Sequence, residues 1–121
     1  MILYLASDLL WATRVKATAA DLGIAARPVR DLGMLEARLG DSPVRGLIVD
    51  LEAEGAWAGM IERLRGERAG ARERSIGIVA FGPHVAVDRL EAARRAGADR
   101  VLARGAFDRD LASILSGLMG S

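Results

Sequence analysis

The chain has 121 residues, of which 51% are hydrophobic and 27% are charged, so it can bury the core of one domain and is not a disordered segment. Its 17 basic and 16 acidic residues are interspersed and leave a net charge of +1. Proteins that bind nucleic acid more often concentrate basic residues in a stripe, so we expect no nucleic-acid partner. The absence of cysteine excludes disulfides, zinc–thiolate sites and thiol catalysis.

The apolar start of the chain, Met1–Ala6, predicts a first strand rather than a targeting segment. It is short, it has no basic flank, and Ser7 and Asp8 interrupt it, whereas a signal peptide combines a basic region with a longer apolar run. No other stretch approaches the ~18 apolar residues of a membrane-spanning helix. We therefore expect a single cytoplasmic domain over residues 1–121 that does not associate with a membrane.

The first half of the chain predicts three strands and two helices. Ser7 or Asp8 can cap the first helix, because short oxygen-bearing side chains accept hydrogen bonds from the free N–H groups of a first turn. Pro28 places the second strand at a sheet edge, and the continuous apolar run Leu47–Val49 indicates a strand covered on both faces. In chain order, the expected elements are a strand at Ile2–Ala6, a helix that ends at Gly23, a strand at Ile24–Val29, a helix at Asp31–Leu39 and a strand at Val44–Asp50.

The second half continues the alternation. Arg68, Arg72 and Arg74 lie among acidic residues and indicate a solvated loop, while Asp108 and Asp110 fit the first turn of the last helix, where the helix dipole favours them. In chain order, the expected elements are a helix at Gly55–Arg65, a charged loop at Gly66–Ser75, a strand at Ile76–Phe81, a helix that carries Val87 and Leu90 and ends at Gly97, a strand at Arg100–Ala103, and a last helix with an apolar stripe from Phe107 to Leu118.

Five strands that alternate with five helices predict an α/β fold, a doubly wound parallel sheet with helices on both faces. Functional sites in this architecture lie beyond the carboxyl ends of the strands. No P-loop or dinucleotide-binding turn follows the first strand, so we expect no cofactor. The candidate site residues at that edge are Ser7, Asp8, Asp50, Gly82, His84 and Arg104.

Three stretches resemble the receiver domain of bacterial response regulators, and the similarity runs over essentially the whole chain. Ala93–Arg104 resembles the receiver stretch in which a helix ends at Gly-Ala-Asp and a short strand then delivers a Lys-Pro pair. Ile48–Leu51 resembles the strand that presents the phosphorylated Asp, and Ile78–Phe81 resembles the strand that carries a Thr or Ser. The resemblance implies a flavodoxin-like sheet of five parallel strands in the order 2-1-3-4-5.

The resemblance places the phosphoacceptor position at Asp50, but the surrounding positions differ. A receiver has an acidic pair after the first strand for Mg²⁺, a hard cation that prefers oxygen ligands, and here the matching positions are Ala6 and Ser7. The receiver hydroxyl falls on Gly82, and its Lys falls on Arg104, which keeps the charge but presents a planar fork of donors. The resemblance therefore implies a degenerate receiver pocket without a bound metal.

Each candidate residue also has a structural interpretation. Asp50 either accepts a phosphoryl group or is a structural acid that ends its strand, caps the following turn or forms an ion pair with Arg104. We predict the ion pair because a buried carboxylate needs a cationic or hydrogen-bonding partner. Asp8 either remains as a metal ligand or caps the first helix, and we favour capping. His84, the only histidine, either relays a proton or is a structural or exposed residue of its turn.

The sequence supports three functions. The preferred one is a non-enzymatic pseudo-receiver in two-component signal transduction, which contacts a sensor or output protein, or a second copy of itself, through its fourth helix, fifth strand and last helix. The second is a single-domain response regulator that is phosphorylated on Asp50, with Asp8 as the metal-binding acid. The third is a small-molecule-binding domain in which His84, Asp50 and Arg104 line the crevice at the strand ends.

Overall fold

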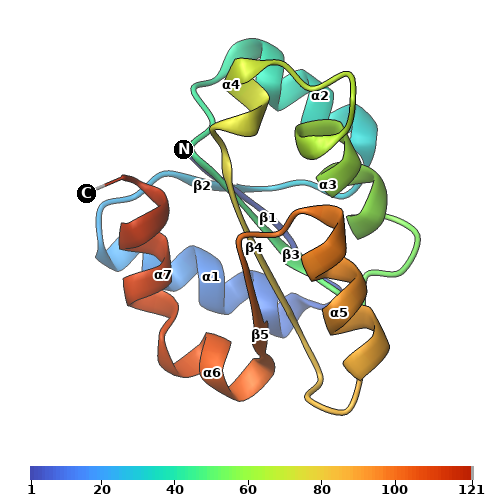
Figure 1. Cartoon of the computed structure of the whole chain (residues 1–121). Helices are drawn as coiled ribbons and strands as arrows, with labels where there is room; N and C mark the ends of the chain where they lie inside the picture. Colours follow the sequence, from blue (N-terminus) through green and yellow to red (C-terminus); the bar gives the residue numbers. More distant parts are fainter. Residues whose placement is uncertain (121) are drawn as a thin grey trace.

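The computed structural model describes residues 1–120 and is an α/β domain in which strands and helices alternate (Figure 1). The strands are β1 (Ile2–Leu5), β2 (Ala26–Pro28), β3 (Gly46–Asp50), β4 (Gly77–Gly82) and β5 (Arg100–Ala103). The helices are α1 (Leu9–Asp21), α2 (Leu32–Asp41), α3 (Trp57–Arg65), α4 (Ala71–Arg74), α5 (Val87–Ala96), α6 (Arg104–Arg109) and α7 (Leu111–Leu118). Within the described residues, no helix is long and apolar enough to cross a membrane.

The five strands form one parallel sheet in the order β2-β1-β3-β4-β5, which confirms the predicted fold class and strand order. Every residue of β1 and β3 is buried, as expected for strands covered on both faces. The strand that ends in Pro28 lies at the sheet edge, as predicted. Because the strands are parallel, the loops that follow them all lie at one edge of the sheet, which we call the carboxyl edge.

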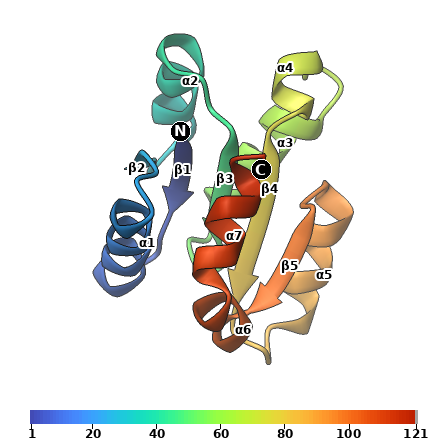
Figure 2. The same cartoon turned by 90° about the vertical axis from the view of Figure 1, so that its left-hand side faces the viewer.

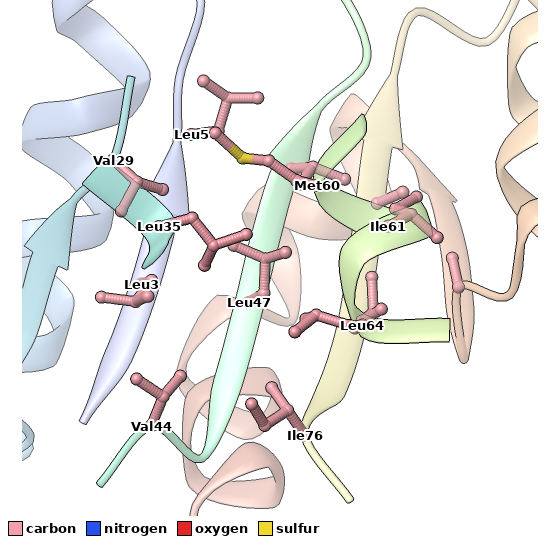
Figure 3. Close-up of a cluster of buried hydrophobic side chains, with 14 of the residues drawn as sticks. Leu3, Leu5, Val29, Leu35, Val44, Leu47, Met60, Ile61, Leu64 and Ile76 are labelled. Carbon is pink, nitrogen blue, oxygen red and sulfur yellow. The ribbon is translucent and has the colours of Figure 1, made fainter. Parts of the chain in front are cut away.

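Two helical layers cover the sheet, and alternate strand residues point into each layer. On one face, β1, β3 and β4 pack against α2, α3 and α5 in a cluster that includes Leu47, Ile61 and Leu64 (Figure 3). On the other face, Ile48 and Phe81 pack with residues of α1, α6 and α7. Successive side chains of a strand point to opposite faces, so Leu47 and Ile48 enter different clusters.

Short polar residues and glycine set the helix ends, as the sequence predicts. The Asp8 carboxylate caps α1 by accepting a hydrogen bond from Trp11 N at 3.0 Å, and Asp31 caps α2 in the same way through Met34 N at 2.8 Å. Gly97 ends α5 with a φ of +117°, a left-handed conformation that glycine adopts without steric penalty.

The segment predicted as a charged loop, Gly66–Ser75, contains the short helix α4. Two of its arginines bind the chain itself: the Arg72 guanidinium donates to the Ser42 carbonyl at 2.8 Å, and Arg74 donates to the Gly66 carbonyl at 2.7 Å. Arg68, Arg72 and Arg74 are exposed, as expected of a solvated segment. The short helix was not predicted, because the backbone acceptors that hold these arginines are not visible in a pattern of residue types.

The last helix is divided at Asp110 into α6 and α7, whereas the sequence predicts one continuous helix. Asp110 has a φ of −101° and a ψ of 11°, outside the helical range, and its carboxylate accepts a hydrogen bond from Arg109. The predicted apolar stripe persists across the break, since Phe107 and Leu111 are both buried against the sheet. One consequence is that Arg104 is the first residue of α6.

Both ends of the described chain lie beside the start of β3, at the sheet edge opposite the carboxyl edge (Figure 2). The terminal amino group of Met1 donates to the Pro43 carbonyl at 3.1 Å, and Arg45 Nη2 donates to the Met119 carbonyl at 2.8 Å. The segment that leads into β3 therefore holds both ends.

Candidate functional site

Asp50, the last residue of β3, is 1% exposed and is the only charged residue in the buried core of residues 1–120. Its strand lies in the middle of the sheet, between β1 and β4. A carboxylate in such a place needs strong partners, because burying it unpaired costs on the order of several kcal/mol. The nature of those partners decides what chemistry the carboxyl edge supports.

Three hydrogen bonds satisfy the Asp50 carboxylate, and all of them come from neutral donors. Ser7 donates twice to Oδ2, from its backbone N–H at 2.9 Å and from its hydroxyl at 2.5 Å. The backbone N–H of Glu52 donates to Oδ1 at 2.9 Å. The loop after β1 supplies Ser7, and the turn after β3 supplies Glu52. Hydrogen bonds to an ionised acceptor are stronger than neutral ones, so these donors stabilise the buried charge.

The predicted ion pair between Asp50 and Arg104 does not form among the described residues. Arg104 pairs with Glu52 instead, and the two side chains are 42% and 37% exposed. An ion pair at the rim keeps part of its hydration, whereas a pair with buried Asp50 requires the guanidinium to lose it. Glu52 was not predicted as a site residue, although it follows Asp50 by only two residues and therefore lies at the same edge of the sheet.

The two positions that match the receiver acidic pair supply no carboxylate. Ala6 ends in a methyl group, and the Ser7 hydroxyl donates to Asp50. Asp8, one residue further on, is exposed and caps α1, so its predicted capping role is confirmed. Where a metal-binding site needs acceptor oxygens, this loop presents hydrogen-bond donors.

Gly82 ends β4 and His84 follows it at the carboxyl edge, but neither donates a hydrogen bond to the Asp50 carboxylate, whose partners are Ser7 and Glu52. Gly82 is buried, and a Cβ at this position would lie 3.3 Å from Leu51 Cβ, so a hydroxyl side chain would have to displace its neighbour slightly. His84 is exposed and makes no hydrogen bond or ion pair with the part of the chain that the structure describes. None of the four described surface clefts is lined by His84 or Asp50.

A Mg²⁺ ion of the kind that the receiver resemblance implies does not fit these residues. Mg²⁺ requires accessible oxygen ligands in a near-octahedral arrangement. Both oxygens of Asp50 already accept hydrogen bonds in a buried position, and Asp8 is engaged in its helix cap. Within residues 1–120, no group of three or more His, Cys, Asp or Glu side chains is arranged to hold a metal ion.

Three aromatic rings support the carboxyl edge from the α1 side of the sheet. Phe81 of β4 stacks on Phe107 of α6 with ring centroids 4.0 Å apart, and Trp11 of α1 lies 5.0 Å from Phe81. Such aromatic pairs stabilise a fold by about 0.5–1.5 kcal/mol beyond their burial. Trp11 is thus half-buried in the packing of three elements.

No protein-family model matches the sequence, and no curated protein is similar enough in sequence to count as a relative. Solved structures, by contrast, match over nearly the whole chain. A response-regulator receiver domain from Bermanella marisrubri superposes with a TM-score of 0.80 at 17% identity, covering 98% of this chain and 97% of that one. A response regulator from Thermotoga maritima gives a TM-score of 0.77 at 14% identity, covering 99% and 97%.

A third structure, a response regulator protein from Burkholderia pseudomallei, contains a phosphorylated aspartic acid, a calcium ion and citrate. It superposes with a TM-score of 0.73 at 17% identity and covers 94% of this chain and 65% of that one. At these identities the likeness establishes the fold. The chain has the fold of response-regulator receiver domains, as its sequence resemblance predicts.

Proposed function

We propose that this protein is a pseudo-receiver, a non-enzymatic, cytoplasmic signalling domain that acts by contact with another protein and is not phosphorylated in a Mg²⁺-dependent reaction. The receiver fold supports a role in signal transduction, because the structures that match nearly the full chain are response regulators. The hydrogen bonding around Asp50 supports the absence of phosphorylation.

The observation that carries the proposal is that Ser7 occupies Oδ2 of Asp50 with two hydrogen bonds. A phosphoacceptor carboxylate must present a free oxygen to the phosphoryl donor, and cations must offset the charge that develops. Here Oδ2 accepts two hydrogen bonds from Ser7, Oδ1 accepts one from Glu52, and the residue is 1% exposed. Arg104, the cation expected beside it, is neutralised by Glu52. The phosphoryl donor therefore has neither a free nucleophile nor a compensating cation.

The partner is a protein, either a sensor or output protein or a second copy of this chain. We favour the face formed by α5, β5 and α6–α7. Its strand lies at the sheet edge and carries the half-buried residues Val101, Leu102 and Ala103, and exposed Val87 begins the adjacent α5. Such an arrangement offers apolar area that a partner can cover.

Incubation with acetyl phosphate and Mg²⁺, followed by measurement of the intact mass, tests whether the protein can be phosphorylated. We expect the mass of the unmodified chain. An added phosphate that disappears in Asp50→Asn would overturn the proposal in favour of its alternative, a single-domain response regulator that uses Asp50 as phosphoacceptor.

A double variant, Ala6→Asp with Ser7→Asp, serves as the matched control because it rebuilds an acidic pair beside Asp50. We expect Mg²⁺ to raise the thermal unfolding temperature of this variant, since a cation that binds only the folded state stabilises it. The unmodified protein should show no such rise. An equal rise in both proteins would indicate that the natural residues already bind the metal.

Native mass measurements over a series of protein concentrations test the contact surface. We expect Val87→Glu to weaken any self-association, because it places a charge on the α5–β5–α6–α7 face. Leu22→Glu is the control, since Leu22 is also exposed but lies at the far end of α1. A chain that stays monomeric throughout would direct the search to a different protein as the partner.

A further inference from the structure

A cleft lies between α1 and the ends of β1 and β2, at the β2 side of the sheet. We call it the α1–β2 cleft. Its volume is about 490 Å³, within the range of about 300–1,000 Å³ of small-molecule sites. Asp50 is not among its lining residues, so this cleft lies beside the Asp50 carboxylate rather than around it, and it shares Ala6, Ser7 and Asp8 with the receiver-like pocket.

One buried polar group opens into the α1–β2 cleft without a partner. Tyr4 of β1 is 4% exposed and lines the cleft, yet its hydroxyl makes no hydrogen bond with any atom of residues 1–120. Among residues 1–120, Arg38 Nε is the only solvent-inaccessible side-chain nitrogen or oxygen that lacks a hydrogen-bond partner. The Tyr4 hydroxyl also lacks a partner, so it must be accessible to solvent. Burial raises the pKa of Tyr4 above its usual value, which keeps the hydroxyl a hydrogen-bond donor at neutral pH.

Two cations line the same cleft and are also unpaired. Lys16 of α1 and Arg30, which follows β2, make no ion pair or hydrogen bond with the described part of the chain. Most arginines of this protein are engaged: Arg14, for example, pairs with Asp108, and Arg104 pairs with Glu52. Two unpaired positive charges beside an open donor produce a local field that favours an anion.

The remaining walls of the α1–β2 cleft combine polar and apolar residues. Ser7, Asp8 and Thr13 are polar, and the Asp8 carboxylate accepts the capping hydrogen bond of α1. Leu9, at the first turn of α1, is 81% exposed and stands at the cleft, and exposed Pro28 of β2 forms part of the opposite side. Binding sites for small molecules combine such apolar walls with a few polar groups that fix orientation. The cleft contains both components in one place.

We propose that the α1–β2 cleft binds a small organic anion. Its carboxylate or phosphate group is held by Lys16 and Arg30 and accepts a hydrogen bond from Tyr4, while its apolar body packs against Leu9 and Pro28. The bound anion also contacts the loop of Ser7, the residue that closes Asp50. This site would therefore provide a chemical input to a domain whose phosphorylation pocket is closed, but its existence does not depend on the proposed function.

Amide chemical shifts of ¹⁵N-labelled protein, titrated separately with benzoate and with phenyl phosphate at constant ionic strength, test the proposal. We expect saturable shifts confined to residues 4–16 and 29–30, with dissociation constants in the millimolar range that ligands of this size reach. Tighter binding of one compound identifies the preferred anionic group. The absence of saturable shifts with both compounds overturns the proposal.

Variants separate a built site from general attraction between charges. Lys16→Gln and Arg30→Gln should each weaken binding about 10-fold, as expected for loss of a charge-assisted contact, and Tyr4→Phe should weaken it less. Arg27→Gln is the matched control, because Arg27 is an exposed, unpaired cation three residues before Arg30 that does not line the cleft. Equal weakening by Arg27→Gln overturns the proposal, and the dispersion of the spectra verifies that each variant is folded.

Discussion

Two aspartates at opposite edges of the sheet are stabilised in different ways. Asp99 directly precedes β5, and its Oδ2 accepts hydrogen bonds from Ile78 N at 2.7 Å and from the Arg65 guanidinium at 3.0 Å. Asp50 ends β3 at the carboxyl edge and accepts hydrogen bonds only from neutral N–H and O–H groups. Asp99 therefore pairs with a cation, whereas Asp50 is buried and has only neutral hydrogen-bond donors around it.

The difference separates the part of the chain that carries the receiver resemblance from the part that carries its candidate site. Asp99 belongs to the Gly97-Ala98-Asp99 stretch on which the resemblance most depends, and it connects β4, the start of β5 and, through Arg65, α3. Its role is structural. At the carboxyl edge Asp50 is present, but Ala6 and Ser7 supply no second carboxylate and Arg104 pairs with Glu52.

The largest effect should come from Asp50→Ala. This change removes the buried carboxylate and leaves the N–H groups of Ser7 and Glu52 without their part-buried acceptor, so we expect a loss of about 3 kcal/mol in the free energy of unfolding. Urea titration measures it. In a site where carboxylates converge, removing one would relieve repulsion and stabilise the protein, so a gain in stability would contradict our description. Asp108→Ala, at an exposed ion pair, should cost at most about 0.5 kcal/mol.

Asp99→Ala should cause the next largest loss in the free energy of unfolding. It removes the acceptor of Ile78 N–H and the carboxylate partner of Arg65, but the Asp99 side chain is 55% exposed, which reduces the cost to about 2 kcal/mol. Asp99→Asn keeps an acceptor for Ile78 and should recover about half of that loss. Equal destabilisation by both changes would mean that the charge, rather than the backbone hydrogen bond, is what matters.

A smaller effect is expected for Ser7→Ala, which removes one of the two hydrogen bonds from Ser7 to Asp50 and retains the backbone one. We expect a loss of about 1 kcal/mol in the free energy of unfolding. Ser7→Thr keeps the hydroxyl and should restore most of it. If Ser7→Ala instead allows acetyl phosphate to modify Asp50, the hydroxyl alone is what closes the pocket.

The smallest effect should come from Arg104→Gln, because its partner Glu52 and the guanidinium are both partly exposed. The expected loss is below about 0.5 kcal/mol and should vanish at high salt. A double-mutant cycle distinguishes the two possible partners, since Arg104 should couple to Glu52 and not to Asp50. Strong coupling to Asp50 would instead support the ion pair between Asp50 and Arg104 that was predicted from the sequence.

Most of the fold could be predicted from the sequence because its signals are local. Alternating apolar strands and helix stripes indicate the doubly wound sheet, Pro28 indicates the edge strand, and Asp8 and Gly97 indicate helix ends. The break of the last helix at Asp110 was missed, because the apolar stripe continues across it and a periodic pattern does not register one non-helical residue.

The site was predicted in its position but not in its bonding. Parallel strands bring Ser7 and Asp50 to one edge whatever their side chains are, so the residues that meet there follow from the topology. Which partner a buried acid selects depends on distances of a few ångströms and on desolvation. Hence Arg104 was assigned to Asp50 although it pairs with Glu52, and the donor role of Ser7 became evident only from the structure.

The anchoring of both chain ends near the start of β3 determines how the molecule can be mounted. A tether joined to Met1 or beyond Met119 leaves from the side of the sheet that faces away from Asp50. A tag at either end therefore immobilises the domain on a sensor surface with its carboxyl edge and the mouth of the α1–β2 cleft directed toward the solution. Fusion to a reporter at either end should likewise leave this edge unobstructed.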